Sequence, residues 1–413
     1  MILFKPFKST YLILFLLLNF QLISCAQKVE NSKLKVRSLE KDTIIKTGAE
    51  RTELYLELLK GKNVAVVANQ TSIIELRNKK QETRHLVDTL ISLGIDIKKV
   101  FAPEHGFRGQ ADAGELFDNS TDKKTGLPIL SLHGKHKKPS QEQLKNIDIV
   151  VFDIQDVGVR FYTYISTLHY VMEACSEAGI QLIILDRPNP NGSYIDGPTL
   201  EPAQKSFLGM HSVPLVYGMT IGEYGKMING EKWLENNLVC NLTVIPLKNY
   251  HHNSTYNLPI KPSPNLPNNK SINLYPSLGL FEGTNINAGR GTEFQFQRFG
   301  APFLDKSKYT FSYTPVSNPG AKHPKHENIL CYGIDLSDEK KLEKVNLQYV
   351  INAYKNATDK TKVFNSANFA KHAGTEKLQQ QIEQGLSEVE IRKTWLKDLE
   401  AFKKIREHYL MYE

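Results

Sequence analysis

The stretch that decides the fold is Val64-Ala65-Val66-Val67-Ala68, a continuous apolar run. Such a run is typical of a strand that is buried on both faces of a sheet. Further strands are predicted at residues 95–102, 147–153 and 180–186, and a helix with apolar residues at helical spacing is predicted at 163–177. Strands that alternate with helices predict an α/β fold around an open, mostly parallel sheet with helices on both faces.

Each predicted strand is followed by a short polar segment. The four segments are residues 69–72, 103–106, 153–156 and 186–192. In open parallel sheets, ligands bind beyond the carboxyl ends of the strands. The four segments therefore predict one shared cleft at that edge of the sheet.

The character of the sequence changes in its second half. A proline-rich loop at residues 262–267 precedes a long stretch at 275–302 that is rich in Gly, Asn and aromatic residues. Near the C-terminus, apolar residues at helical spacing predict a closing pair of amphipathic helices. We therefore predict two domains, at residues 48–235 and 236–413, that face each other across the cleft.

The N-terminus has the pattern of a lipoprotein signal peptide. Two lysines precede an apolar segment at residues 11–22, which is short for a membrane span. A small residue and then Cys25 follow, as in a bacterial lipobox. We expect a signal peptide at residues 1–24, acylation of Cys25 and a polar tether at residues 25–47.

An ordinary signal peptide cut after Ala26, with Cys25 incidental, is the alternative interpretation of this segment. The lipobox predicts an exported protein that is lipid-anchored to the cell envelope, on the periplasmic side or at the outer membrane. No acidic residue follows directly, since the next positions are Ala26 and Gln27. This context favours the outer membrane.

Composition and cysteine spacing argue against several function classes. The formal net charge is +8, but lysine and arginine are spread along the chain, so nucleic acid is not the expected partner. Cys175, Cys240 and Cys331 are far apart and form no CxxC pair, which argues against a zinc site or a disulfide framework. There is no GxGxxG motif after the first strand, and the histidines are not spaced as metal ligands. We therefore expect no metal and no cofactor.

Three carboxylates are candidates for catalysis. Glu104 follows the second strand and Pro103, where a partly desolvated carboxyl group is a candidate general acid. Asp153 ends the third strand, and Glu282 lies in the Gly- and Asn-rich stretch of the second half. A structural role is the alternative for Glu104, which could cap its loop or pair with Arg108.

The polar segments also supply candidates for substrate binding. Prolines 188 and 190 stiffen one loop, and Arg290 lies between two glycines that would let an anionic ligand approach. Structural alternatives stay open, namely an ion pair between Asp156 and Arg160 and a simple turn after the fourth strand. The candidates are Asn69, Gln70, His105, Arg108, Gln155, Asp156, Arg160, Asp186, Arg187, Asn189, Asn285 and Arg290.

Together these segments resemble one family, the NamZ-type (YbbC-like) exo-β-N-acetylmuramidases. The resemblance runs in order through about residues 48–413, and no motif position departs from the family pattern. The matching stretches are residues 66–72, 101–109, 152–164, 185–190, 281–285, 320–322 and 395–409. Several long motifs in one order make the resemblance specific.

The resemblance implies a Rossmann-like domain and a smaller α+β C-terminal domain, with the active site in the cleft between them. It also implies an exo-acting glycoside hydrolase that releases N-acetylmuramic acid from the non-reducing end of peptidoglycan fragments. Glu104 matches the family's proposed catalytic glutamate, and Asp153 and Glu282 are candidates for its partner. The lipid anchor would hold this site beside the peptidoglycan.

The chemistry of the second catalytic group stays open at this point. It is either a carboxylate or the substrate's own 2-acetamido group, oriented by Asp153. Arg187 or Arg290 would pair with the lactyl carboxylate that distinguishes muramic acid from glucosamine. The alternative functions are a non-catalytic cell-wall-binding lipoprotein, and an esterase or amidase that acts on wall peptides.

Overall fold

The structure is a computed structural model that describes residues 43–76, 82–109 and 119–413. Contacts divide the chain into Met1–Ile45 and Lys46–Glu413, and everything below concerns the second unit. The predicted signal peptide at residues 1–24, Cys25 and most of the tether lie outside the described residues. Within the described part of the chain, no helix combines the length and the apolar character needed to cross a membrane.

A seven-stranded sheet forms the centre of this unit, in the order β5-β6-β4-β1-β7-β8-β9. Every neighbouring pair is parallel except β5 and β6. The strands are β1 (Val64–Ala68), β4 (Ile97–Ala102), β5 (Ser120–Thr121), β6 (Pro128–Ser131), β7 (Ile149–Asp153), β8 (Gln181–Leu185) and β9 (Leu242–Ile245). The predicted α/β fold with a mostly parallel sheet is confirmed.

The register aligns the ends of the central strands. Val67 of β1 pairs with Phe101 of β4 on one side and with Phe152 of β7 on the other. All three strands are almost wholly buried near their carboxyl ends. The polar segments that follow them therefore start at one edge of the sheet.

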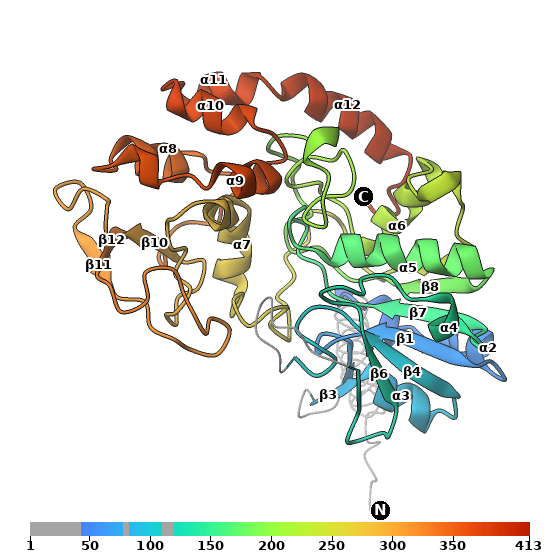
Figure 1. Cartoon of the computed structure of the whole chain (residues 1–413). Helices are drawn as coiled ribbons and strands as arrows, with labels where there is room; N and C mark the ends of the chain where they lie inside the picture. The colour runs from blue at the N-terminus through green and yellow to red at the C-terminus, as the bar shows by residue number, and fades with distance from the viewer. Residues whose placement is uncertain (1–42, 77–81, 110–118) are drawn as a thin grey trace, which may run out of the picture. The chain divides into compact units, whose positions relative to one another are not determined.

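Helices cover both faces of this sheet, as Figure 1 shows. On one face, α5 (Tyr164–Ala178) and α6 (Ile221–Gly230) share a buried apolar cluster with alternate strand residues such as Phe152 and Ile184. On the other face, α3 (Leu86–Ser92) and the short α2 (Leu56–Leu59) pack with Val66 and Val151. Burial on both faces explains why the strands are continuous apolar runs.

The C-terminal part combines a small antiparallel sheet with short helices. Its strands pair in the order β10-β12-β11, and α7 passes directly into the 3-10 helix η5. The elements are α7 (Asn269–Leu278), η5 (Gly279–Gly283), β10 (Arg298–Ala301), β11 (Phe311–Tyr313), β12 (Cys331–Asp335), α8 (Gln348–Lys355), α9 (Ser366–Ala373), α10 (Lys377–Glu383), α11 (Glu388–Lys393) and α12 (Leu396–Glu407). This is the smaller α+β region expected from the sequence. The domain boundary at residues 235/236 stays a prediction. The large sheet includes β9 (Leu242–Ile245), which follows that boundary in the sequence.

The C-terminal segment differs from the predicted helix pair, because it forms three short helices. Gly385 adopts a left-handed φ of 82° after α10, and Ser387 then forms a capping box that starts α11. These two residues interrupt the apolar periodicity. Trp395 and Phe402 are buried as expected, whereas Leu396 is exposed.

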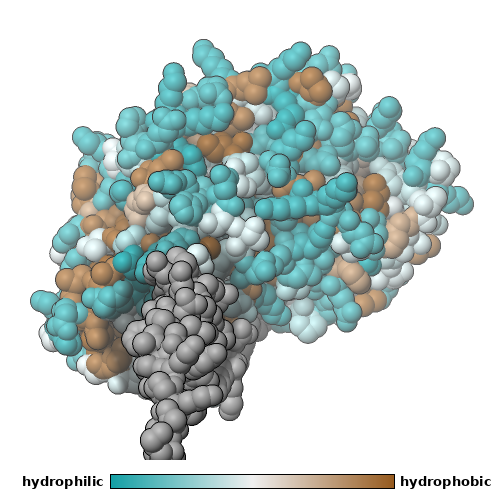
Figure 2. All heavy atoms as spheres, turned by 180° about the vertical axis from the view of Figure 1, so that it is seen from behind, coloured by the Kyte–Doolittle hydropathy of each residue, from teal (hydrophilic) through white to brown (hydrophobic). Residues whose placement is uncertain are grey.

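The remaining elements are short and peripheral to the site. They are β2 (Ile73–Leu76), β3 (Glu82–His85), α4 (Gln141–Leu144) and the 3-10 helices η1 (Gly48–Glu50), η2 (Thr52–Leu54), η3 (Pro202–Gln204), η4 (Glu235–Asn237) and η6 (Lys360–Lys362). On the face shown in Figure 2, hydrophilic residues cover most of the described surface and apolar residues are scattered among them. Exposed apolar side chains such as Val239 and Val389 come from separate segments, which is ordinary for a protein surface.

Candidate active site

A pocket of about 260 Å³ lies where the loop after β4 meets the start of α5 and the C-terminal region. This volume is close to the lower end of small-molecule sites, which begin at roughly 300 Å³. The lining residues are Glu104, His105, Phe161, Tyr162, Thr163, Tyr164, Leu208, Ser263, Asn265, Leu266, Tyr275, Glu282, Arg290, Phe296 and His372. The pocket thus combines two carboxylates, one arginine and several aromatic rings.

Glu104 reaches the pocket because β4 ends in a sharp turn. His105 and Gly106 both have positive φ values, 71° and 74°, and the Gly106 amide donates to the Pro103 carbonyl at 3.0 Å. A left-handed histidine is uncommon, and such backbone is often found at functional sites. The Glu104 carbonyl accepts a hydrogen bond from the Tyr164 hydroxyl at 3.4 Å, which ties the turn to α5.

Glu282, at the end of η5, is the second carboxylate of the pocket. Its Oε2 lies 2.8 Å from Nη1 of Arg290, and each of the two side chains is about one-quarter exposed. Lys325 Nζ donates to the carbonyls of Phe281 and Thr284, at 2.8 and 2.6 Å. Burial alone would raise the pKa of Glu282, but the charges of Arg290 and Lys325 outweigh it and hold the pKa below its usual range. Glu282 is therefore ionised at neutral pH.

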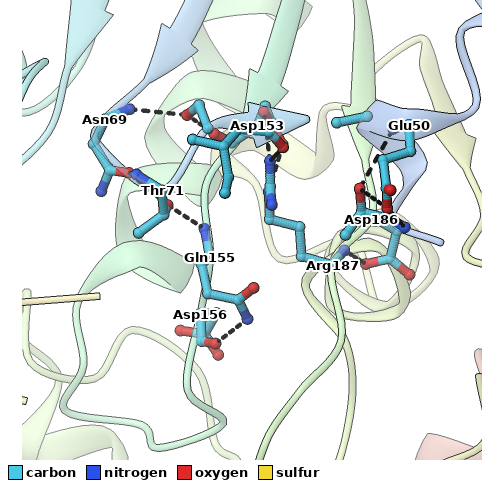
Figure 3. Close-up of polar contacts among 12 residues, drawn as sticks. Glu50, Asn69, Thr71, Asp153, Gln155, Asp156, Asp186 and Arg187 are labelled. Atoms are coloured by element: carbon cyan, nitrogen blue, oxygen red, sulfur yellow. Dashed lines mark hydrogen bonds and ion pairs between the residues drawn. The ribbon is translucent and has the colours of Figure 1, made fainter. Parts of the chain in front are cut away.

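The polar segments after β1, β7 and β8 form a separate cluster, which we call the strand-end network (Figure 3). Its members are Asn69, Thr71, Asp153, Gln155, Asp186 and Arg187. Asp153 and Arg187 form a buried bidentate ion pair, with Nε–Oδ1 at 2.6 Å and Nη2–Oδ2 at 2.9 Å. Burial works against the charge of Arg187, but its contact with Asp153 outweighs this and raises the arginine pKa.

Hydrogen bonds satisfy the rest of the strand-end network. The backbone amide and hydroxyl of Thr71 donate to Asn69 Oδ1 at 2.9 and 2.6 Å, and the Gln155 amide donates to Thr71 Oγ1 at 3.0 Å. Asp186 accepts from the hydroxyls of Thr220 and Tyr412 at 2.8 and 2.6 Å. Burial raises the pKa of Asp186 to about 7. None of these six residues lines the pocket.

Two comparisons with known sequences settle the family. The model for the N-terminal region of the exo-beta-N-acetylmuramidase NamZ matches residues 64–270, and the model for its C-terminal region matches residues 273–412. The chain belongs to the NamZ exo-β-N-acetylmuramidase family. The peptidoglycan beta-N-acetylmuramidase NamZ of Bacillus subtilis (strain 168) is 37% identical over 426 residues, covering 98% of this chain and 100% of the relative.

Two solved structures are similar to this chain over most of its length. A DUF1343 family protein from Bacteroides fragilis has a TM-score of 0.82 at 44% identity and covers 90% of this chain and 99% of its own. A second DUF1343 family protein from the same organism has a TM-score of 0.75 at 28% identity, covering 90% and 100%. The resemblance drawn from the motifs is confirmed, as is membership of a glycoside hydrolase family.

In this NamZ family member, the pocket gathers only part of the predicted site. Glu104, His105, Glu282 and Arg290 line it together, although they come from distant parts of the chain. The single shared cleft expected from all four polar segments is not observed, because only residues 103–106 reach the pocket. The other three segments are mostly buried, with Gln70 and Pro190 part-exposed, and their polar side chains find partners with one another and with backbone groups.

Several predicted binding residues have structural partners elsewhere. Gln70 Nε2 donates to the Pro262 carbonyl at 3.0 Å, beside the pocket wall. Arg108 pairs with Asp88 and Asp122, at 3.1 and 2.8 Å. The buried side-chain amide of Asn189 donates to the Met219 carbonyl. The exposed side-chain amide of Asn285 donates to the Lys362 carbonyl.

The ion pair between Asp156 and Arg160, the structural alternative for these two candidates, does not form, because the two residues have other partners. Asp156 accepts from the Tyr217 hydroxyl and from the Gly158 amide at 2.8 Å, and burial raises its pKa to about 6. Arg160 is fully buried and donates to four backbone carbonyls, two of which belong to His372 and Ala373. Burial lowers the pKa of Arg160 to about 9.

Arg160 holds the end of α9 in place, and with it the His372 part of the pocket wall. The next residue, Gly374, has φ +81°, and a Cβ there would meet Arg160 Nη2 at 2.4 Å. Only glycine therefore fits at this position. Arg160 acts through the backbone it positions.

Sequence reasoning missed much of the pocket wall. Tyr162 and Tyr164 lie in an aromatic run directly before and at the start of α5, a composition that suits sugar binding. Asn265, Tyr275 and His372 carry no comparable signal, because none of them follows a strand of the large sheet. Across the described residues, no cluster of His, Cys, Asp and Glu could hold a metal ion.

Proposed function

We propose that this chain is an exo-acting glycoside hydrolase that releases N-acetylmuramic acid from the non-reducing end of peptidoglycan fragments. The observation that carries the proposal is a pocket with two carboxylates, Glu104 and Glu282, one of them held ionised by neighbouring cations. Glycoside hydrolysis uses such a pair, one carboxyl group as the acid and the other at the anomeric carbon. The small volume of the pocket suits one terminal sugar.

Glu104 is the general acid in this proposal. It would protonate the glycosidic oxygen as the bond to the anomeric carbon breaks. Its place on a strained turn, tied to α5 by the Tyr164 hydroxyl, supports this role because a general acid must be held in one position. No comparable constraint brings Asp153 to the pocket, since it is fully buried against Arg187.

Glu282 is the proposed partner. A carboxylate that stays ionised can stabilise the positive charge that develops at the anomeric carbon, or act as nucleophile or base. Carboxyl groups about 5–5.5 Å apart give retention of configuration, and groups about 6.5–9.5 Å apart give inversion. The anomer released first from a chromogenic glycoside, read by NMR, distinguishes the two courses.

Arg290 is the proposed contact for the lactyl carboxylate of muramic acid. It lines the pocket, where its Nη1 donates to Glu282 at 2.8 Å. Its Nη2 makes only a long hydrogen bond of 3.4 Å to the Gly320 carbonyl, so Nη2 can also donate to an anion. Arg187 is less suited, because two of its nitrogens bind Asp153 and one of these also donates to the Ile73 carbonyl.

The chain is also proposed to be a lipoprotein of the cell envelope, anchored through Cys25. The support is the lipobox pattern alone. Fractionation of cells that express the full chain tests it. The wild type is expected with the membranes and Cys25→Ala in the soluble fraction or uncleaved; equal distribution of both would exclude the anchor.

The activity is tested by incubating the purified chain with muropeptides that carry N-acetylmuramic acid at the non-reducing end. Mass spectrometry is expected to find free N-acetylmuramic acid with the wild type and very little with Glu104→Gln. Binding without release would indicate the non-catalytic wall-binding lipoprotein. Release of peptide or acyl groups instead of sugar would indicate the esterase or amidase.

A further inference from the structure

Tyr275 projects into the pocket from α7. The helix runs on into η5, so Glu282 follows Tyr275 seven residues later, which is about two helical turns. Both side chains therefore point to the same side of this segment and meet the same cavity. Tyr275 is part-buried, and its ring forms wall rather than surface.

Three aromatic rings hold the Tyr275 ring by their edges. Its centroid lies 4.8 Å from Phe296, 5.1 Å from Phe161 and 6.0 Å from Tyr162, with interplanar angles of 84° to 88°. Gly279 makes this packing possible, because a Cβ at that position would meet the Phe161 ring at 2.4 Å. Edge-to-face packing on three sides fixes the orientation of the ring. The hydroxyl is therefore presented in one direction.

The Tyr275 hydroxyl differs from those of the other pocket tyrosines. Tyr162 donates to the Pro262 carbonyl at 2.8 Å, and Tyr164 accepts from Asn69 at 2.9 Å and donates to the Glu104 carbonyl. Among the described residues, no hydrogen bond is formed by the Tyr275 hydroxyl. Because a tyrosine hydroxyl in a protein interior usually has a partner, this one is a donor with an open position in the pocket.

The charges around Tyr275 keep its hydroxyl protonated. Burial raises the pKa of the phenol far above its usual value, and the carboxylates of Glu282 and then Glu104 raise it further. Both carboxylates thus act on this one hydroxyl, which lies within the electrostatic reach of each. The group is a neutral hydrogen-bond donor beside the two proposed catalytic carboxylates.

We propose that the Tyr275 hydroxyl donates a hydrogen bond to the carbonyl oxygen of the substrate's 2-acetamido group, and so makes the pocket selective for N-acetylated sugars. This inference rests on the proposed function, in which Glu104 and Glu282 flank the anomeric carbon. The acetamido group is attached to the neighbouring ring carbon, so its oxygen comes close to a donor that lies near both carboxylates.

The chemistry of the substrate favours this oxygen over the others nearby. The glycosidic oxygen receives its proton from Glu104, and the ring oxygen loses electron density as the oxocarbenium-like transition state forms. An amide carbonyl is a strong acceptor with two lone pairs. A site built to donate to this carbonyl discriminates against sugars that lack it, because its donor is then left unpaired.

The test compares binding of two ligands by calorimetry: N-acetylmuramic acid, and 3-O-lactylglucose, which has a hydroxyl in place of the acetamido group. The proteins are the wild type, Tyr275→Phe and a control, Tyr354→Phe, on the α8 helix outside the pocket. Phenylalanine keeps the ring contacts and removes only the hydroxyl. Thermal unfolding of all three checks that the fold is retained.

Tyr275→Phe is expected to bind N-acetylmuramic acid about tenfold more weakly, the upper range for one neutral hydrogen bond, and 3-O-lactylglucose as tightly as the wild type does. Tyr354→Phe is expected to match the wild type with both. Equal weakening for both ligands would overturn the proposal, because it would mean disturbed packing. Unchanged binding of N-acetylmuramic acid would overturn it as well.

The pH dependence of turnover gives a second, independent check. If the hydroxyl bound Glu282 instead of the sugar, Tyr275→Phe would shift the acidic limb of the kcat profile, and such a shift would also overturn the proposal. Failure of the proposed function would give a different experimental result. The wild type would then release no N-acetylmuramic acid from muropeptides, whatever the ligand preference of the variant.

Discussion

The strand-end network and the pocket are two polar clusters in one fold, and they differ in how their polar groups are satisfied. In the network, Asp153 and Arg187 neutralise each other and Thr71 donates two hydrogen bonds to Asn69, and all four residues are buried. In the pocket, Glu282 and Arg290 remain partly exposed. A satisfied cluster stabilises the fold, whereas a cluster with open positions can bind a ligand.

The two clusters are also connected. Asn69 of the network donates to the Tyr164 hydroxyl, which in turn donates to the Glu104 carbonyl. The network therefore supports the turn that carries the proposed acid. Polar residues at strand ends therefore include both a catalytic candidate, Glu104, and the residues that hold its turn in place.

The largest effect is expected from Glu104→Gln in the pocket. Removal of a general acid costs about 10²–10⁴-fold in turnover. We expect at least about a hundredfold loss in kcat on an N-acetylmuramic acid glycoside, with an unchanged unfolding midpoint. Glu57→Gln on α2, far from the pocket lining, is the control. Near-normal turnover of a folded Glu104→Gln protein would remove Glu104 from this role.

Breaking the ion pair of the strand-end network should lower the free energy of unfolding. Arg187→Met leaves the buried Asp153 carboxylate without its partner, which costs about 3–5 kcal/mol of unfolding free energy. Urea unfolding measures this loss. The double variant Asp153→Leu with Arg187→Met is expected to regain much of it, because no unpaired charge is left behind. An unchanged midpoint in Arg187→Met would contradict the structural role.

Arg290→Met should reduce the release of N-acetylmuramic acid more than the release of N-acetylglucosamine. Loss of a hydrogen bond to a charged group is worth about 1.5–3 kcal/mol, or about ten- to a hundredfold. We expect release of N-acetylmuramic acid to fall by this factor and residual release of N-acetylglucosamine to fall much less. Equal loss on both substrates would exclude the lactyl contact. Arg298→Met, which breaks a pair with Asp335 outside the pocket, is the control.

The same variant should change the pH profile. Arg290 lowers the pKa of Glu282, so its removal raises that pKa. Glu282 acts in its ionised form in the proposed mechanism. The acidic limb of activity should therefore move to higher pH in Arg290→Met and stay in place in Arg298→Met.

The last prediction concerns His85, which links the network to the N-terminus of α3. Its Nε2 lies 2.9 Å from the Asn69 carbonyl, and its Nδ1 accepts from the Val87 amide. Burial lowers the pKa of His85 to about 4, so between that value and about 6.5 the unfolded chain binds a proton that the folded chain does not. This difference in proton binding makes its full contribution to the free energy of unfolding above about pH 6.5. The contribution is lost as the pH falls toward 4, by up to about 1.4 kcal/mol per pH unit.

His85→Asn removes this pH-dependent contribution and little else, because asparagine can still cap the helix but does not titrate. The difference in unfolding free energy between wild type and variant should depend on pH only within this window. Urea unfolding at several pH values measures it. A difference that is constant from pH 4 to pH 7 would show that His85 is not buried in its neutral form.

Much of the fold was predictable from the sequence, because its strands are local patterns. The runs at β1, β7 and β8 are almost wholly apolar, which is typical of strands in the middle of a covered parallel sheet. The C-terminal helices were less predictable. One glycine with a left-handed φ and one serine cap give three helices where the apolar spacing alone predicts a pair.

Local sequence patterns specify where polar side chains leave the sheet, and they place Glu104 directly after β4. It also supplied the motifs of the NamZ family, which the comparisons confirmed. These features depend on residues close together in the chain.

Which polar residues face the cavity depends on tertiary packing. Asp153 is buried because Arg187, 34 residues away, reaches it, and Tyr275 and His372 enter the wall because α7 and α9 pack beside the turn of Glu104. A polar side chain is satisfied by whatever partner folding brings within hydrogen-bond distance. That partner is set by long-range packing, and no local pattern in the sequence specifies it.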